Sequence, residues 1–128
     1  MRIVLDASAL LAFLHGERGA EMVDANLEGA WISSVNWSEV LQKSMEHGVN
    51  TDGLSEDWAE LGVMVQPFLI EDALRMARYW LRSRALGLSF ADRASLALGA
   101  RSGGVVVTAD RAWIDLIGTD YPVIQLIR

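Results

Sequence analysis

The chain has 128 residues, of which 52% are hydrophobic and 22% charged, and its formal net charge is −6. This composition is typical of one globular domain, here residues 1–128, and excludes a disordered chain. The absence of cysteine excludes disulfides, zinc–thiolate sites and thiol nucleophiles.

Short apolar runs alternate with segments of helical periodicity along the chain. In chain order we predict strands at residues 2–5, 30–33, 63–65, 105–107 and 123–127, and helices at 7–14, 19–27, 37–47, 52–61, 70–83, 91–101 and 111–117. Strands separated by helices require right-handed crossovers, which produce a mainly parallel sheet covered on both faces. The predicted fold class is therefore α/β.

The apolar start of the chain predicts a buried strand and a helix rather than a signal peptide or a membrane span. Asp6 interrupts this run, and the apolar stretch that remains, residues 9–14, is far shorter than the roughly 20 residues that a span needs. We therefore expect no membrane association and a cytoplasmic location.

Four acidic residues are predicted to lie at one edge of the sheet. Asp6 follows the first strand, Glu39 lies early in the helix after the second, and Asp110 comes shortly after the valine-rich strand. Asp92 joins them if its helix begins at the same edge. Ligands of such sheets bind at the carboxyl ends of the strands, which is where these acids are expected.

Each acid also has an ordinary structural interpretation. Asp6 and Asp110 fit turns or helix caps. Glu39 could close a capping box with Asn36, and Asp92 could close one with Ser89. Four carboxylates at one edge are harder to explain in this way. Two of them about 5 Å apart repel by roughly 3 kcal/mol, so they need a cation or protons, and oxygen ligands favour Mg²⁺ or Mn²⁺.

The segments that carry these acids resemble, in order, the motifs of PIN domains and of VapC-type toxins in particular. They are IVLDASAL at 3–10, SVNWSEV at 34–40, LSFADRASLAL at 88–98 and VTADRAW at 107–113. The resemblance implies a PIN-like three-layer α/β/α fold with a five-stranded sheet in the order 3-2-1-4-5. It also implies an endoribonuclease that hydrolyses RNA with metal-activated water.

The same resemblance implies the roles of individual residues. The catalytic acids, which would bind Mg²⁺ or Mn²⁺ directly or through water, are Asp6, Glu39, Asp92 and Asp110. Ser8 and Thr108 would be hydroxyls that orient a ligand or a water, although a local cap or turn explains them equally well. The implied partners are RNA, a cognate antitoxin and a second copy of the chain.

The net charge hides an uneven distribution of arginines. Residues 1–70 carry a net charge of −8, whereas residues 71–128 carry 8 arginines and 6 acids, a net charge of +2. The candidate RNA-binding residues are Arg75, Arg78, Arg82, Arg93 and Arg111. The first three form one stripe of the helix at 70–83, which a solvated face of an amphipathic helix also explains. The opposite, apolar face carries Ala73, Ala77, Trp80 and Leu81.

Other functions fit the sequence less well. A receiver domain needs a lysine after the last strands, but the only lysine is Lys43. A nucleoside-triphosphate site needs a glycine-rich phosphate loop, and the sequence has none. A haloacid-dehalogenase-type phosphatase needs a second aspartate where Ser8 stands. The alternative from another functional class is a PIN domain that binds RNA or a protein without cutting.

Overall fold

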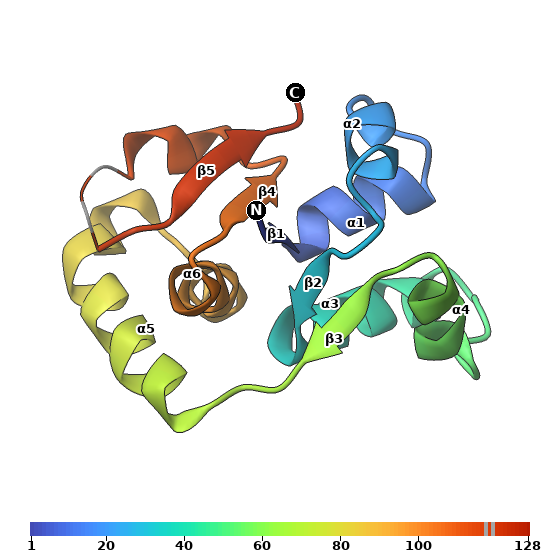
Figure 1. Cartoon of the computed structure of the whole chain (residues 1–128), viewed down its shortest axis with the longest axis horizontal. Helices are drawn as coiled ribbons and strands as arrows, with labels where there is room; N and C mark the ends of the chain where they lie inside the picture. Colours follow the sequence, from blue (N-terminus) through green and yellow to red (C-terminus); the bar gives the residue numbers. More distant parts are fainter. Residues whose placement is uncertain (117, 119) are drawn as a thin grey trace.

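The computed structural model describes residues 1–116, 118 and 120–128 (Figure 1). One parallel sheet has the strand order β3-β2-β1-β4-β5, which confirms the predicted fold class and order. The strands are β1 (Ile3–Leu5), β2 (Trp31–Ser33), β3 (Met64–Gln66), β4 (Val105–Thr108) and β5 (Val123–Leu126). Leu5 pairs with Ile32 on one side and with Val107 on the other, so the carboxyl ends of β2, β1 and β4 meet at one edge.

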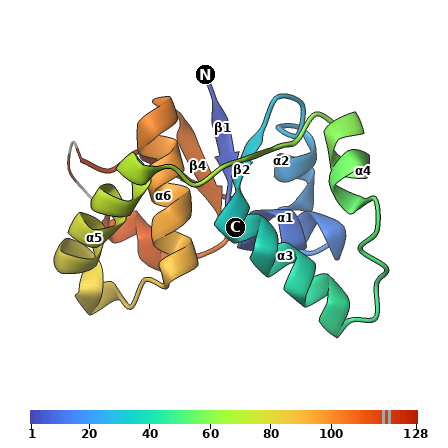
Figure 2. The same cartoon turned by 90° about the horizontal axis from the view of Figure 1, so that it is seen from below.

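Helices cover both faces of the sheet. They are α1 (Ala7–Leu14), α2 (Ala20–Asp24), α3 (Ser34–Glu46), α4 (Leu54–Glu60), α5 (Ile70–Ser83) and α6 (Phe90–Ser102), with the 3-10 helices η1 (Arg84–Leu86) and η2 (Arg111–Asp115). Figure 2 shows α5 and α6 on one side of the strands and α1 to α4 on the other. None of the helices in the described residues is long and apolar enough to cross a membrane.

The predicted boundaries differ from the observed ones mainly at helix ends. α3 begins at Ser34 rather than at residue 37, because the hydroxyl of Ser33 accepts a hydrogen bond from the Val35 N–H and caps the helix. The helix predicted at 111–117 is the 3-10 helix η2, and residue 117 lies outside the described residues. α1 and α5 have the predicted bounds.

The central strands are buried on both faces and divide the interior into two cores. One core contains Leu5, Ile32 and Val107 beneath α1 and α3. The other contains Val4 and Val106 beneath α5 and α6. Alternate residues of β1 and β4 therefore face opposite cores, which explains why these strands have continuous apolar sequences.

The face of α5 that packs against the protein is not the apolar face of its sequence. The buried side chains are Asp72, Met76, Tyr79 and Ser83. The exposed side chains include Ala73, Ala77, Trp80 and Leu81. The buried polar groups have partners: Asp72 pairs with Arg101 at 3.1 Å, and the Tyr79 hydroxyl donates to the backbone oxygen of Asp120. Such partners offset the cost of burying polar groups, so hydrophobicity alone does not decide which face is inside.

α6 packs tightly against β4 at Gly99. A Cβ atom at this position would lie 2.3 Å from Cγ2 of Val106 and 3.1 Å from the ring of Pro122. Only a residue without a side chain permits this approach. Since Asp92 lies about two turns earlier on the same helix, the contact at Gly99 helps to place that acid.

We predict that Gly99→Ala destabilises the protein, although alanine is favoured over glycine inside a helix by about 1 kcal/mol. The new methyl group would clash with Val106, and overpacking of this kind costs about 1–3 kcal/mol. Urea unfolding of Gly99→Ala, Val106→Ala and the double variant measures the effect. The double variant should lose less stability than the two single losses together. Additive losses, or a more stable Gly99→Ala, would contradict the steric explanation.

Candidate active site

Asp6 is the buried acid at the centre of the carboxyl edge. Its backbone N–H donates to the oxygen of Val107 on β4 at 3.1 Å. Its Oδ1 accepts hydrogen bonds from the Ala9 N–H (2.9 Å) and the Ser8 hydroxyl (2.7 Å), and its Oδ2 accepts one from the Thr108 hydroxyl (2.5 Å). Burial raises the pKa of Asp6 to about 6, although these hydrogen bonds lower it. Asp6 is also the cap of α1.

The hydroxyls of Ser8 and Thr108 connect Asp6 to the turn that follows β4. Besides donating to Asp6, the Ser8 hydroxyl accepts from the Ala109 N–H and the Thr108 hydroxyl accepts from the Asp110 N–H, both at 3.0 Å. These contacts fix the carboxylate of Asp6 and the backbone of Asp110 relative to each other. A role in orienting a ligand or a water stays a prediction.

Glu39 lies in the second turn of α3 and is half-buried. The capping box predicted for Glu39 and Asn36 is wrong, because α3 begins before Asn36 and Ser33 caps it. The carboxylate accepts no hydrogen bond from the described part of the chain. Burial and then the negative charge of Asp92 raise the pKa of Glu39 above its ordinary value.

Asp92 closes the capping box that the sequence predicted with Ser89 at the start of α6. The Ser89 N–H donates to Oδ2 of Asp92 at 2.9 Å, and the Asp92 N–H donates to the Ser89 hydroxyl at 3.0 Å. Among the described residues, none donates to the other oxygen, Oδ1. Burial raises the pKa of Asp92, and the charge of Asp110 raises it further. The capping role therefore leaves one oxygen of Asp92 for a ligand.

Asp110 is exposed and caps η2. Its Oδ1 accepts a hydrogen bond from the Ala112 N–H at 3.0 Å. Within residues 1–116, 118 and 120–128, nothing donates to its Oδ2. Like Asp92, it combines a structural role at a helix start with one oxygen that is not engaged.

The structure brings the four acids together around Asp92. The charge of Asp92 raises the pKa of both Asp6 and Glu39, and the charge of Asp110 raises that of Asp92. Each acid therefore lies close enough to Asp92 for electrostatic interaction, although their positions span most of the sequence. Such repulsion at one edge of the sheet favours either protons or a cation.

The chemistry of these side chains fits a hard divalent cation. All the donors are carboxylate oxygens, which are the ligands that Mg²⁺ and Mn²⁺ prefer. Asp92 and Asp110 each offer one oxygen with no hydrogen bond from a described residue, and Glu39 offers both. Across the described residues, however, no three acidic or histidine side chains are already arranged to hold one ion. The donor set is present without a closed set of ligands, so metal binding stays a prediction.

Asn36 is a buried residue of this region that the sequence did not identify as important. Its Oδ1 accepts from the Ala7 N–H at 3.0 Å, and its Nδ2 donates to the Ala91 oxygen at 2.9 Å. Ala7 follows Asp6, and Ala91 precedes Asp92. Asn36 therefore joins α3 to the backbone beside two of the acids, and only one orientation of its amide satisfies both partners. Its contacts span 29 and 55 residues, so no local sequence pattern indicates them.

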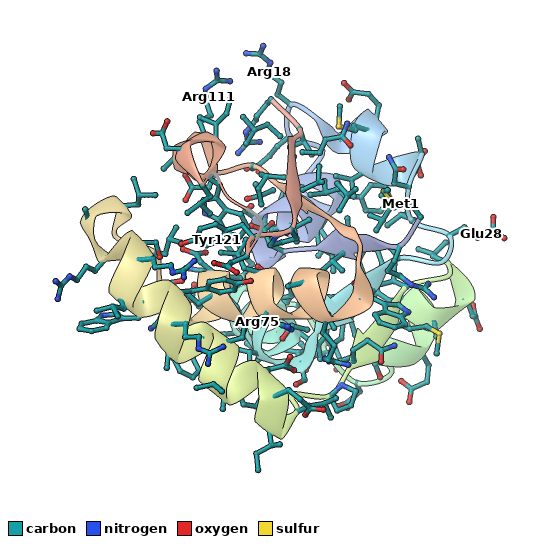
Figure 3. All side chains as sticks on the ribbon, turned by 60° about the vertical axis from the view of Figure 1, so that its left-hand side comes forward. Met1, Arg18, Glu28, Arg75, Arg111 and Tyr121 are labelled. Carbon is teal, nitrogen blue, oxygen red and sulfur yellow. The ribbon has the colours of Figure 1, made fainter. Side chains whose placement is uncertain are left out.

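Arg93 and Arg111 differ in their surroundings. Arg93 is half-buried, donates to the Met76 oxygen at 3.2 Å, and its charge opposes the rise in the pKa of Asp92. Arg111 is exposed, points away from the protein in Figure 3 and donates to the Arg128 oxygen at 2.9 Å. The charge of Arg93 therefore partly balances that of Asp92, and RNA binding by either residue stays a prediction.

The arginine stripe of α5 lies elsewhere. Arg75, Arg78 and Arg82 line a pocket together with the last turns of α6 and the residues before β5. None of the four acids lines this pocket. The predicted stripe therefore exists, but it belongs to a separate cavity.

The sequence matches the family model of the PIN domain over residues 3–117. The chain therefore belongs to the PIN-domain family. The matched range contains all four acids and every strand except β5. No curated protein sequence matches the chain.

Solved structures with the same fold belong to toxin–antitoxin complexes. A chain of the DNA-bound VapBC structure from Salmonella typhimurium superposes with a TM-score of 0.74 at 16% identity, and the match covers 100% of this chain and 99% of that one. VapBC-1 from nontypeable Haemophilus influenzae gives 0.72 at 15% identity, with 99% and 98% covered. A toxin–antitoxin complex from Klebsiella pneumoniae gives 0.68 at 18% identity, with 94% and 99% covered. At these identities the similarity establishes the fold.

We predict that Asn36→Ala lowers the free energy of unfolding by about 1–3 kcal/mol, because it leaves the buried Ala7 N–H without its acceptor and removes the hydrogen bond to the Ala91 oxygen. Asn26→Ala is the matched control, since among the described residues the Asn26 amide donates only to the Met22 oxygen one turn earlier, away from the acids. Chemical denaturation of both variants measures the difference. Equal losses for the two variants would show that Asn36 has no special place in this region.

We predict that in EDTA the wild-type protein loses stability relative to Asp6→Asn as the pH rises from about 4 to about 6. The ordinary pKa of Asp6 is 3.8 and its folded value is about 6, so in this range the folded state binds more protons than the unfolded state. A shift of this size corresponds to about 3 kcal/mol, fully developed above pH 6. Thermal unfolding of both proteins between pH 4 and pH 7 measures it. Parallel curves would contradict a raised pKa.

Proposed function

We propose that the protein is a Mg²⁺- or Mn²⁺-dependent endoribonuclease that hydrolyses RNA phosphodiester bonds. The observation that supports this most strongly is the grouping of Asp6, Glu39 and Asp110 around Asp92 at the carboxyl edge of the sheet. If these acids only capped helices, they would not need to lie close enough to interact electrostatically. Membership of the PIN-domain family supports the same function.

The four acids differ in how many of their oxygens are available to a cation. Asp6 is held by three hydrogen bonds, so it presents its carboxylate in one orientation. Asp92, Asp110 and Glu39 carry the oxygens available to the cation, directly or through water. When bound, the cation supplies a Lewis acid that neutralises charge on the phosphate and lowers the pKa of a water. Burial, and to a smaller extent the charges of neighbouring acids, raise the pKa values of Asp6, Asp92 and Glu39, so without a cation these carboxylates take up protons more readily.

We further propose that the protein is the toxin of a toxin–antitoxin pair, with a cognate antitoxin as its partner, and that it forms a homodimer in the cytoplasm. The similar structures are described as VapBC or toxin–antitoxin complexes, which supports an antitoxin partner. The exposed apolar residues of α5, among them Ile70, Leu74 and Leu81, provide surface that a partner could cover.

We predict that Asp110→Asn lowers RNA cleavage in Mn²⁺ by at least about 100-fold and that EDTA abolishes cleavage by the wild type. The asparagine oxygen can still accept from the Ala112 N–H, so the cap and the fold should persist. Cleavage of a labelled single-stranded RNA measures the effect. Asp115→Asn, also on η2 and exposed, is the control for loss of one negative charge.

A second measurement separates metal binding from catalysis. Mn²⁺ should raise the melting temperature of the wild type more than that of Asp110→Asn, because a ligand that binds the folded state stabilises it. Cleavage that persists in EDTA or in Asp110→Asn would refute the proposed mechanism. RNA binding without any cleavage would favour the non-catalytic alternative.

A further inference from the structure

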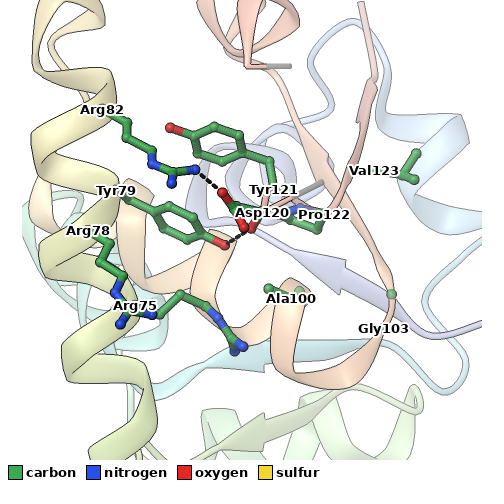
Figure 4. Close-up of a pocket in the computed structure, with 12 residues that line it drawn as sticks. Arg75, Arg78, Tyr79, Arg82, Ala100, Gly103, Asp120, Tyr121, Pro122 and Val123 are labelled. Atoms are coloured by element: carbon green, nitrogen blue, oxygen red, sulfur yellow. Dashed lines mark hydrogen bonds and ion pairs between the residues drawn. The ribbon is translucent and has the colours of Figure 1, made fainter. Parts of the chain in front are cut away.

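A cavity lies between α5, the last turns of α6 and the residues before β5. Its volume is about 500 Å³, and we name it the arginine pocket because Arg75, Arg78 and Arg82 line it. Figure 4 shows these three side chains along one face of α5, with Asp120 and Tyr121 opposite. A cavity of this size is large enough for a nucleotide.

The pocket carries an excess of positive charge in a protein whose net charge is −6. Arg82 forms an ion pair with Asp120, the one acid among the described residues that line the pocket. Arg75 and Arg78 form no ion pair or hydrogen bond with any residue that the structure describes. Arg101, by contrast, pairs with Asp72. Two guanidinium groups at one cavity, neither with a partner among the described residues, fit an anionic ligand from outside the chain.

The remaining walls suit a nucleotide better than a carboxylate-bearing peptide. Gly103 leaves part of one wall without a side chain, and nothing lies within 4 Å of where its Cβ would be, so a ligand can approach the backbone there. Tyr79 and Tyr121 stack with ring centroids 4.8 Å apart and an interplanar angle of 21°. Tyr121 is only partly buried, so its ring can extend the stack to a base, as aromatic side chains do in single-stranded RNA binding.

The pocket is separate from the acidic site. Gly104 directly precedes β4 and Val123 begins β5, so the pocket lies toward the amino ends of the strands, whereas the acids lie at the carboxyl ends. Along α6, Asp92 lies seven residues before Gly99, the pocket residue of this helix that comes first, or about 10 Å away. An RNA bound in the pocket would therefore be held at a point away from the bond that is cut.

We propose that the arginine pocket binds a phosphate of the single-stranded RNA substrate, with Arg75 and Arg78 on the phosphate and Tyr121 available to an adjacent base. The proposal rests on the RNA-directed function above and extends it with a second contact. The pocket contributes affinity and positioning, and the acids contribute the chemistry.

The test measures binding in a background that does not cut. In Asp6→Asn, the affinity for a fluorescent single-stranded RNA of about 12 nucleotides is measured by anisotropy at several salt concentrations. Arg75→Ala with Arg78→Ala should weaken binding roughly tenfold and reduce the salt slope by about 0.7 for each arginine. Arg84→Ala is the control, because Arg84 is exposed, follows α5 directly and does not line the pocket. Arg75→Ala and Arg78→Ala are also measured singly, because each then loses one positive charge, as Arg84→Ala does.

Each outcome decides the question. Single losses at Arg75 and Arg78 no larger than that of Arg84→Ala would overturn the proposal. Arginine-dependent binding of an oligoglutamate peptide without arginine-dependent binding of RNA would also overturn it, in favour of a protein partner. If the wild type fails to cut RNA but Asp6→Asn binds RNA through Arg75 and Arg78, the nuclease function fails and the pocket stands. If it cuts and the arginine variants match the control, the pocket alone fails.

Discussion

The carboxylate of Asp6 is the constraint on which the carboxyl edge of the sheet depends. An ionised carboxylate buried without donors is very costly, so it must receive hydrogen bonds from its neighbours. Those donors come from the first turn of α1 and from Thr108 at the end of β4. Asp6 is therefore satisfied only when β1 and β4 are paired in register and α1 begins at residue 7. Asn36 extends the same network to α3 and α6.

Two of the other acids show that a capping role leaves room for a proposed functional role in the same side chain. Asp92 and Asp110 each use one oxygen to cap a helix and keep the other without a partner among the described residues. Caps give these carboxylates fixed positions at little cost, because helix starts favour negative charge. A capping motif in a sequence is therefore weak evidence against a catalytic role when several such motifs meet at one sheet edge.

The sequence predicted a mainly parallel sheet and the common edge of the acids, because parallel strands bring their carboxyl ends together whatever the loops do, and its resemblance to PIN domains implied the strand order. It did not predict Asn36, whose partners are backbone groups that only the tertiary structure brings near. It also does not reveal which face of α5 is buried: that face contains Asp72 and Tyr79, whose partners Arg101 and Asp120 lie far along the chain. The separation of the α5 arginines from the acids depends in the same way on how α5 packs beside α6, which periodicity does not reveal.

The spread of the four acids along the chain has a consequence for biosynthesis. Asp110 lies near the carboxyl end, and the hydroxyl of Thr108 that holds Asp6 is almost as late. A ribosome that has made the first hundred residues has made β1, β2 and β3 but not β4. Until β4 and the turn after it emerge, Asp6 lacks the Thr108 hydroxyl as a donor, and the acidic group lacks Asp110. An incomplete nascent chain, or a fragment released by premature termination, thus carries only part of the constellation.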